Sequence, residues 1–275
     1  MPEPSSPTVR RRRLAAELRK LRERAGLIGE QVAERMGWST SKVSRIENAH
    51  STPRPSEIRE LLLLYGIDGE YAEQLVALAR EANRKGWWEG YAGALPDAHT
   101  EYIGLGAEAT SSCHWAPEFV PGLVQTEDYA RVVITSNARA IAHVPPGEIQ
   151  SRIEARMIRQ KILEREPPFE LDLVLDESVL LRRIGQNEVM QRQIDRLIKV
   201  SELETVTLRI LPLDGPHAII TGGFTLLQFG TAREIDYHDV AYLEHLTGAN
   251  NFEAEKDIPV SACVRAPGGN VPSTW

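Results

Sequence analysis

The stretch that most constrains this chain is residues 29–48, which reads GEQVAERMGWSTSKVSRIEN. Apolar residues one turn apart predict two short amphipathic helices. Gly37, between them, can adopt the positive φ that a tight turn requires, and Ser39 can cap the second helix with its hydroxyl. Two short helices joined by such a turn are typical of a helix-turn-helix. The side chains expected to face inward are those of Val32, Met36, Trp38, Val43 and Ile46.

The outward face of the second helix, residues 40–48, carries polar side chains that can hydrogen-bond DNA. In a helix-turn-helix the second helix enters the major groove and its first residues reach base edges. A long cationic side chain there can reach guanine or a phosphate. The alternative, a merely polar surface, is disfavoured by the intact interior pattern. Glu47 is expected to form an ion pair inside the small domain. The candidate DNA-binding residues of this helix are Thr40, Ser41, Lys42, Ser44 and Arg45.

Four consecutive arginines near the N-terminus are further candidates for DNA contact. They begin a predicted first helix that Thr8 could cap and that runs to about residue 25. Two interpretations stay open: a solvated charged helix end, or an arm that contacts phosphates or the minor groove. The four residues are Arg10, Arg11, Arg12 and Arg13.

Charge is distributed unevenly along the 275 residues. The net charge is −7, which by itself argues against a DNA-binding protein. Residues 1–54, however, hold twelve Lys and Arg against six Asp and Glu, a net +6, and the remainder carries −13. A basic head suits phosphate, while an acidic body is repelled by it and helps to orient the molecule on DNA.

Several motifs resemble a known family. Residues 14–67 resemble the lambda-repressor/Cro-like, or Xre-type, helix-turn-helix family. The segment WSTSKVSRIEN is similar to an actinobacterial, antitoxin-like branch of it, in which a large C-terminal domain of undefined function follows. The match continues at GWW (86–88), VPGLVQTEDYA (120–130) and RMIRQ (156–160). The resemblance implies an all-α five-helix lambda-repressor-like DNA-binding domain followed by a mixed α/β domain.

The chain also departs from this family. Many relatives begin the first motif helix with a Ser or Thr cap and then Gln, where this chain has Ile28 and Gly29. Many also begin the recognition helix with Gln, where this chain has Thr40. A cap and a possible phosphate contact are therefore missing, and the operator sequence cannot be transferred from relatives.

Domain boundaries follow from composition and periodicity. In the second domain, alternating apolar residues predict strands near 169–175, 206–211, 224–229 and 240–243, interspersed with amphipathic helices. Trp87 and Trp88 could form a ligand box, but are more simply explained as anchors of a linker. The expected parts are a disordered tail 1–9, a helix-turn-helix domain 10–83, a Trp-rich linker 84–101, a mixed α/β domain 102–256 and a loose tail 257–275.

No sequence motif points to catalysis, a metal or a cofactor. Cys113 with His114, and His238 with His245, lack metal-ligand spacing, and no apolar run is long enough to span a membrane. We therefore expect a cytoplasmic, sequence-specific regulator that binds a double-stranded DNA operator, with no enzymatic activity. Its second domain would dimerise, sense a signal or dock a partner. The resemblance implies an alternative: an antitoxin-like protein that neutralises a small protein encoded by a neighbouring gene and binds DNA to regulate itself.

Overall fold

The computed structural model describes residues 7–141, 144–215, 222–230, 238–245 and 248–253. The chain divides into two compact units, Met1–Trp87 and Trp88–Trp275. None of the helices in these described ranges is long and apolar enough to cross a membrane.

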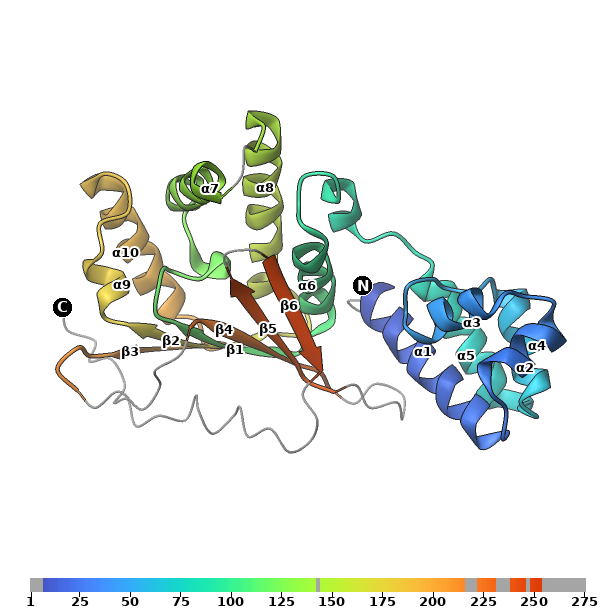
Figure 1. Cartoon of the computed structure of the whole chain (residues 1–275). Coiled ribbons are helices and arrows are strands. Elements are labelled where there is room, and N and C mark those ends of the chain that lie inside the picture. The colour runs from blue at the N-terminus through green and yellow to red at the C-terminus, as the bar shows by residue number, and fades with distance from the viewer. Residues whose placement is uncertain (1–6, 142–143, 216–221, 231–237, 246–247, 254–275) are drawn as a thin grey trace. The chain divides into compact units, whose positions relative to one another are not determined.

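The described part of the first unit is helical (Figure 1). Its core is built from leucine, isoleucine and valine side chains at helical spacing, among them Leu14, Leu18, Ile58 and Leu75, all below 2% exposed. Helix α1 packs against α5 and α3, α4 packs against α5, and α2 against α3. The elements are α1 (Pro7–Arg24), α2 (Gly29–Met36), α3 (Thr40–Glu47), α4 (Pro55–Leu64) and α5 (Gly69–Ala82).

Helix α1 begins earlier than the sequence predicts. Its first residue is Pro7, so Thr8 lies inside the helix and is not its cap. Proline is well placed in a first turn because the N–H that it lacks would have no helical partner there. Val9, expected in a disordered tail, is fully buried. Of the expected tail, residues 1–6 lie outside the described ranges.

Trp88 anchors the start of the second unit. It lies in the short 3-10 helix η1 (Trp87–Tyr91) and packs with Leu95, Ile103 and Ala155 in one buried cluster. Trp87 remains 39% exposed. Residues expected to form a linker thus include a side chain that belongs to the second unit's core.

The second unit joins one mixed sheet to a set of helices (Figure 1). Helices α6 to α10 are drawn on the same side of that sheet. The helices are α6 (Asp97–Glu108), η2 (Gly122–Val124), α7 (Glu127–Ile141), α8 (Pro146–Arg159), η3 (Gln160–Glu164), α9 (Ser178–Leu181) and α10 (Asn187–Ser201). The strands are β1 (Ser111–Ala116), β2 (Glu170–Asp176), β3 (Val206–Leu211), β4 (Phe224–Gln228), β5 (Val240–His245) and β6 (Gly248–Glu253).

The sheet has the strand order β3-β2-β1-β4-β5-β6. Strands β3, β2 and β1 run parallel, whereas β4, β5 and β6 continue the sheet by antiparallel pairing. The change occurs at β1, where His114 lies between Leu173 of β2 and Thr225 of β4. The prediction of a mixed α/β domain is confirmed, and the four expected strands correspond to β2, β3, β4 and β5. Strands β1 and β6 were not predicted. The expected C-terminal tail, with Cys263, lies outside the described residues.

Candidate nucleic-acid interface

The turn between α2 and α3 has the geometry expected of its sequence. Gly37 ends α2 in the left-handed region with φ 64° and ψ 32°. Ser39 is the N-cap of α3, and its Oγ accepts a hydrogen bond from the Lys42 N–H at 3.2 Å. The predicted cap and the predicted positive-φ turn are both confirmed, and together they fix where α3 begins.

The inward face of this pair of helices is only partly as predicted. Val32, Val43 and Ile46 are buried. Met36 and Trp38, expected inside, are half-buried. For Trp38 the reason is visible, because the Lys42 Nζ lies 3.8 Å from the centroid of its ring. One face of the indole therefore carries a cation and does not pack into the core.

The side chains of Thr40, Ser41, Ser44 and Arg45 are exposed on α3. They present hydroxyls and a guanidinium, groups that can donate hydrogen bonds to base edges or phosphates. Thr40 and Ser44 also line a groove of about 450 Å³ between α1, α2 and α3.

Lys42 is held differently from the other α3 candidates. It is half-buried, and its Nζ donates to Glu57 Oε1 at 2.6 Å. Partial burial raises the pKa of Glu57, but hydrogen bonds from Lys42 and from the Arg54 N–H outweigh this, so the pKa is lowered overall. The Lys42 ammonium therefore already has a carboxylate and an aromatic partner within the first unit.

The arginine run is part of α1 and is not an exposed end. Arg10 forms an ion pair with Glu81 of α5, and its side chain is only 11% exposed. Arg13 is buried, and Arg11 and Arg12 are half-buried. The interpretation as a solvated helix end does not fit this packing, whereas contact of the run with phosphates or the minor groove stays a prediction.

An ion pair links α1 to α3. Arg22 donates from Nε to Glu47 Oε1 at 2.6 Å and from Nη2 to Oε2 at 2.9 Å. The Glu47 bond raises the pKa of Arg22 against the opposing effect of burial. The expectation that Glu47 forms an ion pair inside this domain is confirmed. The sequence did not identify its partner, which lies 25 residues away.

The missing cap of α2 is replaced from within the helix. Ile28 occupies the N-cap position and its side chain has no acceptor. Gln31 Oε1 instead accepts the Ile28 N–H at 3.0 Å. A glutamine or glutamate three residues after a cap is a recognisable signal for this bond. Glu57 does the same at α4, where its Oε2 accepts the Arg54 N–H at 2.7 Å.

The described residues contain no group of three or more His, Cys, Asp or Glu side chains arranged to hold a metal. His114 is buried in the second unit, where Ser112 Oγ and Thr225 Oγ1 lie 2.9 Å and 3.1 Å from its two ring nitrogens. The neighbouring Cys113 thiol has a pKa raised to about 11, first by burial and then by Asp172.

Two family models match the chain. The model described as a domain of unknown function (DUF5753) matches residues 100–261, more than half of the chain. The model described as a helix-turn-helix domain matches residues 13–75. No curated protein and no solved structure matches the chain. The helix-turn-helix match suggests a DNA-binding regulator.

Proposed function

The chain belongs to the DUF5753 family and also carries a helix-turn-helix domain, and we propose that it is a sequence-specific regulator of transcription in the cytoplasm that inserts α3 into the DNA major groove. The observation that carries this proposal is the construction of α3. Ser39 caps its start, Val43 and Ile46 bury one face, and the opposite face leaves polar side chains exposed. This is the arrangement through which a recognition helix reads base edges.

Each side chain has a distinct role in this proposal. Thr40 and Ser41 stand at the N-terminal end of α3, where hydroxyls can meet bases. Arg45 lies one turn further and reaches a base or a phosphate. Lys42 contributes less, because Glu57 and Trp38 hold its ammonium. The excess positive charge of residues 1–54 supports phosphate attraction.

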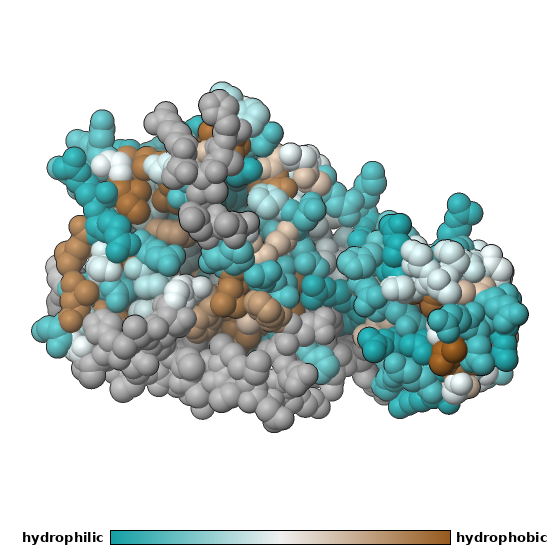
Figure 2. All heavy atoms as spheres, viewed as in Figure 1, coloured by the Kyte–Doolittle hydropathy of each residue, from teal (hydrophilic) through white to brown (hydrophobic). Residues whose placement is uncertain are grey.

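We further propose that the protein binds DNA as a homodimer through its second unit. Helix α10 leaves Ile194 and Ile198 exposed one turn apart, and Leu203 follows them. Figure 2 shows hydrophobic surface at the edge of the second unit where Figure 1 draws α9 and α10. Two copies would present two recognition helices to half-sites about 34 Å apart. Analytical ultracentrifugation that shows a monomer both without DNA and bound to DNA would remove dimerisation from the proposal.

The same apolar surface supports an alternative, an antitoxin-like role in which it binds a small protein encoded next to this one. The net −13 of residues 55–275 favours a basic partner. Co-expression and pull-down with the neighbouring gene product separate the two roles. Capture by the second unit, with a phenotype that survives deletion of residues 1–87, would favour the antitoxin-like role.

Selection of duplex DNA from a random library with the full chain tests DNA recognition. We expect a defined sequence to be enriched, and Arg45→Ala to weaken binding to it. Arg80→Ala serves as a matched control, because Arg80 is an exposed arginine on α5 of the same unit. Equal binding by both variants would remove Arg45 from the interface, and selection without any enriched sequence would refute sequence-specific recognition.

A further inference from the structure

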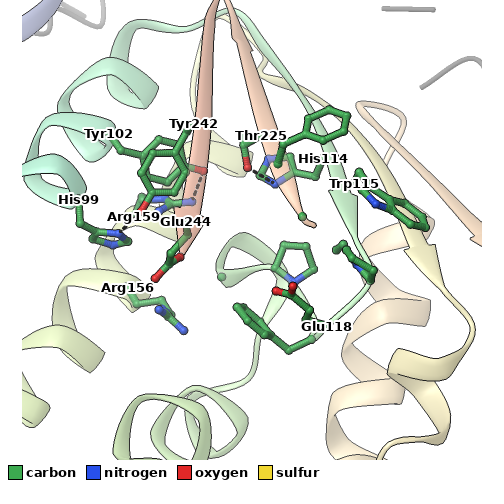
Figure 3. Close-up of a pocket in the computed structure, with 17 residues that line it drawn as sticks. His99, Tyr102, His114, Trp115, Glu118, Arg156, Arg159, Thr225, Tyr242 and Glu244 are labelled. Carbon is green, nitrogen blue, oxygen red and sulfur yellow. Dashed lines mark hydrogen bonds between the residues drawn. The ribbon is translucent and has the colours of Figure 1, made fainter. Parts of the chain in front are cut away.

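A cavity of about 100 Å³ lies within the second unit at the carboxyl end of β1 (Figure 3). Its walls come from α6, α8 and the strands β1, β4 and β5. These are segments far apart in sequence, and they enclose two arginines, two histidines and two tyrosines. None of them is used by the proposed DNA interface.

The floor of the cavity is a row of side chains across three strands. His114 of β1 pairs in register with Thr225 of β4, which pairs with Tyr242 of β5. Both ring nitrogens of His114 have hydroxyl neighbours, and burial, assisted by Arg159, lowers its pKa to about 3. This histidine is therefore neutral at physiological pH and contributes shape and polarity to the floor, not charge.

Two arginines three residues apart on α8 supply the positive charge of the cavity. Arg156 donates to Gln125 Oε1 at 2.7 Å and Arg159 donates to the Tyr102 hydroxyl at 3.0 Å. Both partners are neutral. Within the described part of the chain, neither guanidinium has a carboxylate at ion-pair distance, although both side chains are half-buried.

The charge of these two arginines is poorly compensated. Burial and then the nearby Arg159 lower the pKa of Arg156 to about 10, against the opposing effect of Glu244, so it stays protonated at neutral pH. Each guanidinium carries five N–H donors, and the bonds described here use one on each. Glu244 compensates this half-buried charge only in part, because no carboxylate lies at ion-pair distance, and an anion bound between the two arginines would reduce the remaining cost.

Aromatic packing holds Arg159 in place. The rings of Tyr102 and Tyr242 stack with centroids 3.9 Å apart and planes 8° apart, and the Arg159 guanidinium carbon lies 4.5 Å from the centroid of the Tyr102 ring. The Tyr242 hydroxyl meets His99 Nδ1 at 3.1 Å. This stack fixes the arginine before any ligand arrives, which lowers the entropy lost on binding.

The remaining lining sets the size and charge of an occupant. Pro117, Phe119 and Phe224 provide apolar walls. Glu118 and Glu244 are exposed side chains of the same lining. Their carboxylates disfavour a polyanion such as nucleic acid, while a single anionic group beyond them can still face Arg156 and Arg159.

We propose that this cavity binds a small organic anion, with its carboxylate or phosphate between Arg156 and Arg159 and a flat apolar body against Pro117, Phe119 and Phe224. The guanidinium fork pairs with either anionic group. The site goes beyond the proposed function, because its occupancy is measured without DNA and does not depend on DNA recognition.

The experiment titrates the full chain with benzoate, phenyl phosphate and the neutral benzamide, using calorimetry and ligand-detected magnetic resonance. At least one of the two anions should bind at one site per chain, while benzamide binds at least about tenfold more weakly, since it offers no charge-assisted bond. Comparing benzoate with phenyl phosphate identifies the preferred anionic group.

Three variants assign the binding to this cavity. Arg156→Gln should lower the affinity for the anion at least about tenfold. Arg156→Lys should retain part of that affinity, because one charged donor remains. Arg131→Gln, which alters an exposed arginine of α7 outside the lining, should bind like the wild type. Thermal unfolding followed by circular dichroism verifies that each variant is folded.

The proposal would be overturned if neither anion binds the folded wild type with a dissociation constant below about 10 mM. This limit corresponds to a weak binding free energy of about 3 kcal/mol. Equal affinity in the wild type and in folded Arg156→Gln would also overturn it, because the anion would then bind elsewhere. Equal affinity for benzamide and benzoate would show that the cavity selects shape and not charge, which contradicts the assigned role of the two arginines.

Discussion

Arg22 of α1 and Glu47 of α3 form a two-point ion pair, with donor–acceptor distances of 2.6 Å and 2.9 Å and side chains only 13% and 12% exposed. The pair fixes α3 to the first helix of the unit. Arg22 also donates from Nη1 to the Leu27 carbonyl at 2.8 Å, so it holds the loop before α2 as well.

Glu47→Ala is therefore expected to destabilise the first unit by about 3 kcal/mol, because it leaves a largely buried guanidinium without its carboxylate. Urea unfolding followed by circular dichroism measures this change. Glu23→Ala is the matched control: Glu23 also lies near Arg22, but it is 55% exposed, and its loss should change stability by no more than about 0.5 kcal/mol. Similar effects of the two substitutions would contradict the structural role of the ion pair.

Lys42 and Arg45 should contribute unequally to DNA binding. Arg45→Ala is expected to cost about 1–3 kcal/mol of specific binding, and Lys42→Ala less, since Glu57 already holds the Lys42 ammonium. Fluorescence anisotropy with the selected operator measures both affinities. A larger loss for Lys42→Ala would mean that the bond to Glu57 breaks when DNA binds.

Glu57→Gln tests the same restraint from the other side. The amide keeps an oxygen for the Arg54 N–H but loses the charge that holds Lys42. The freed ammonium should steepen the dependence of log affinity on log salt concentration by up to about one. An unchanged slope would indicate that Lys42 does not reach phosphate even when released.

Two glycines of the motif should respond differently to substitution by alanine. Gly37 has φ 64°, where a Cβ costs about 1–2 kcal/mol, so Gly37→Ala should lower stability. Gly29 begins α2, and a Cβ there would meet only Val43 Cγ1 at an ordinary 3.9 Å. Gly29→Ala should be neutral or stabilising by up to about 1 kcal/mol. Thermal unfolding of the two variants provides the comparison, and an equal loss of stability in both, or no loss for Gly37→Ala, would contradict the turn geometry.

The first unit was largely predictable because its signals are local. The Gly37 turn, the Ser39 cap and the apolar spacing of α3 depend on residues within one or two turns of each other. Its ion pairs were not predictable, because Arg10 with Glu81 and Lys42 with Glu57 join different helices. The burial of Arg10 and Arg13 was not predictable for the same reason, since burial of a charged run depends on tertiary partners.

The second unit was predictable in class but not in topology. Strand β1 was missed because the polar residues Ser112 and His114 are not expected inside a buried strand. In the structure they form a hydrogen bond with each other inside the unit, which makes their burial possible. Strand β6 was missed because glycine and asparagine are depleted in strands, and pairing with β5 outweighs that tendency. The anion cavity left no sequence signal, since its residues range from His99 to Glu244 and meet only through the sheet order.

Acidification should destabilise the second unit through His114. Burial lowers its folded-state pKa to about 3, whereas an unfolded histidine titrates near 6.5. The free energy that neutral His114 contributes to the stability of the second unit is therefore present above pH 6.5 and is lost as the pH falls towards 3. Between pH 6.5 and 5 the loss should reach about 2 kcal/mol. Chemical unfolding across this range should show a steeper decline for wild type than for His114→Gln. His238→Gln, at an exposed histidine, should behave like wild type, and parallel curves for all three would contradict the assignment.

The exposed face of α3 is proposed to read DNA sequence. The most direct measurement is the ratio of affinities for the selected operator and for a scrambled duplex of equal length, determined at one fixed salt concentration for wild type and for Thr40→Ala/Arg45→Ala. We expect a wild-type ratio of at least about a thousand, which falls by at least about tenfold in the double variant while its affinity for the scrambled duplex changes far less. A wild-type ratio near one, or a ratio unchanged by the double substitution, would show that this face of α3 does not read DNA sequence.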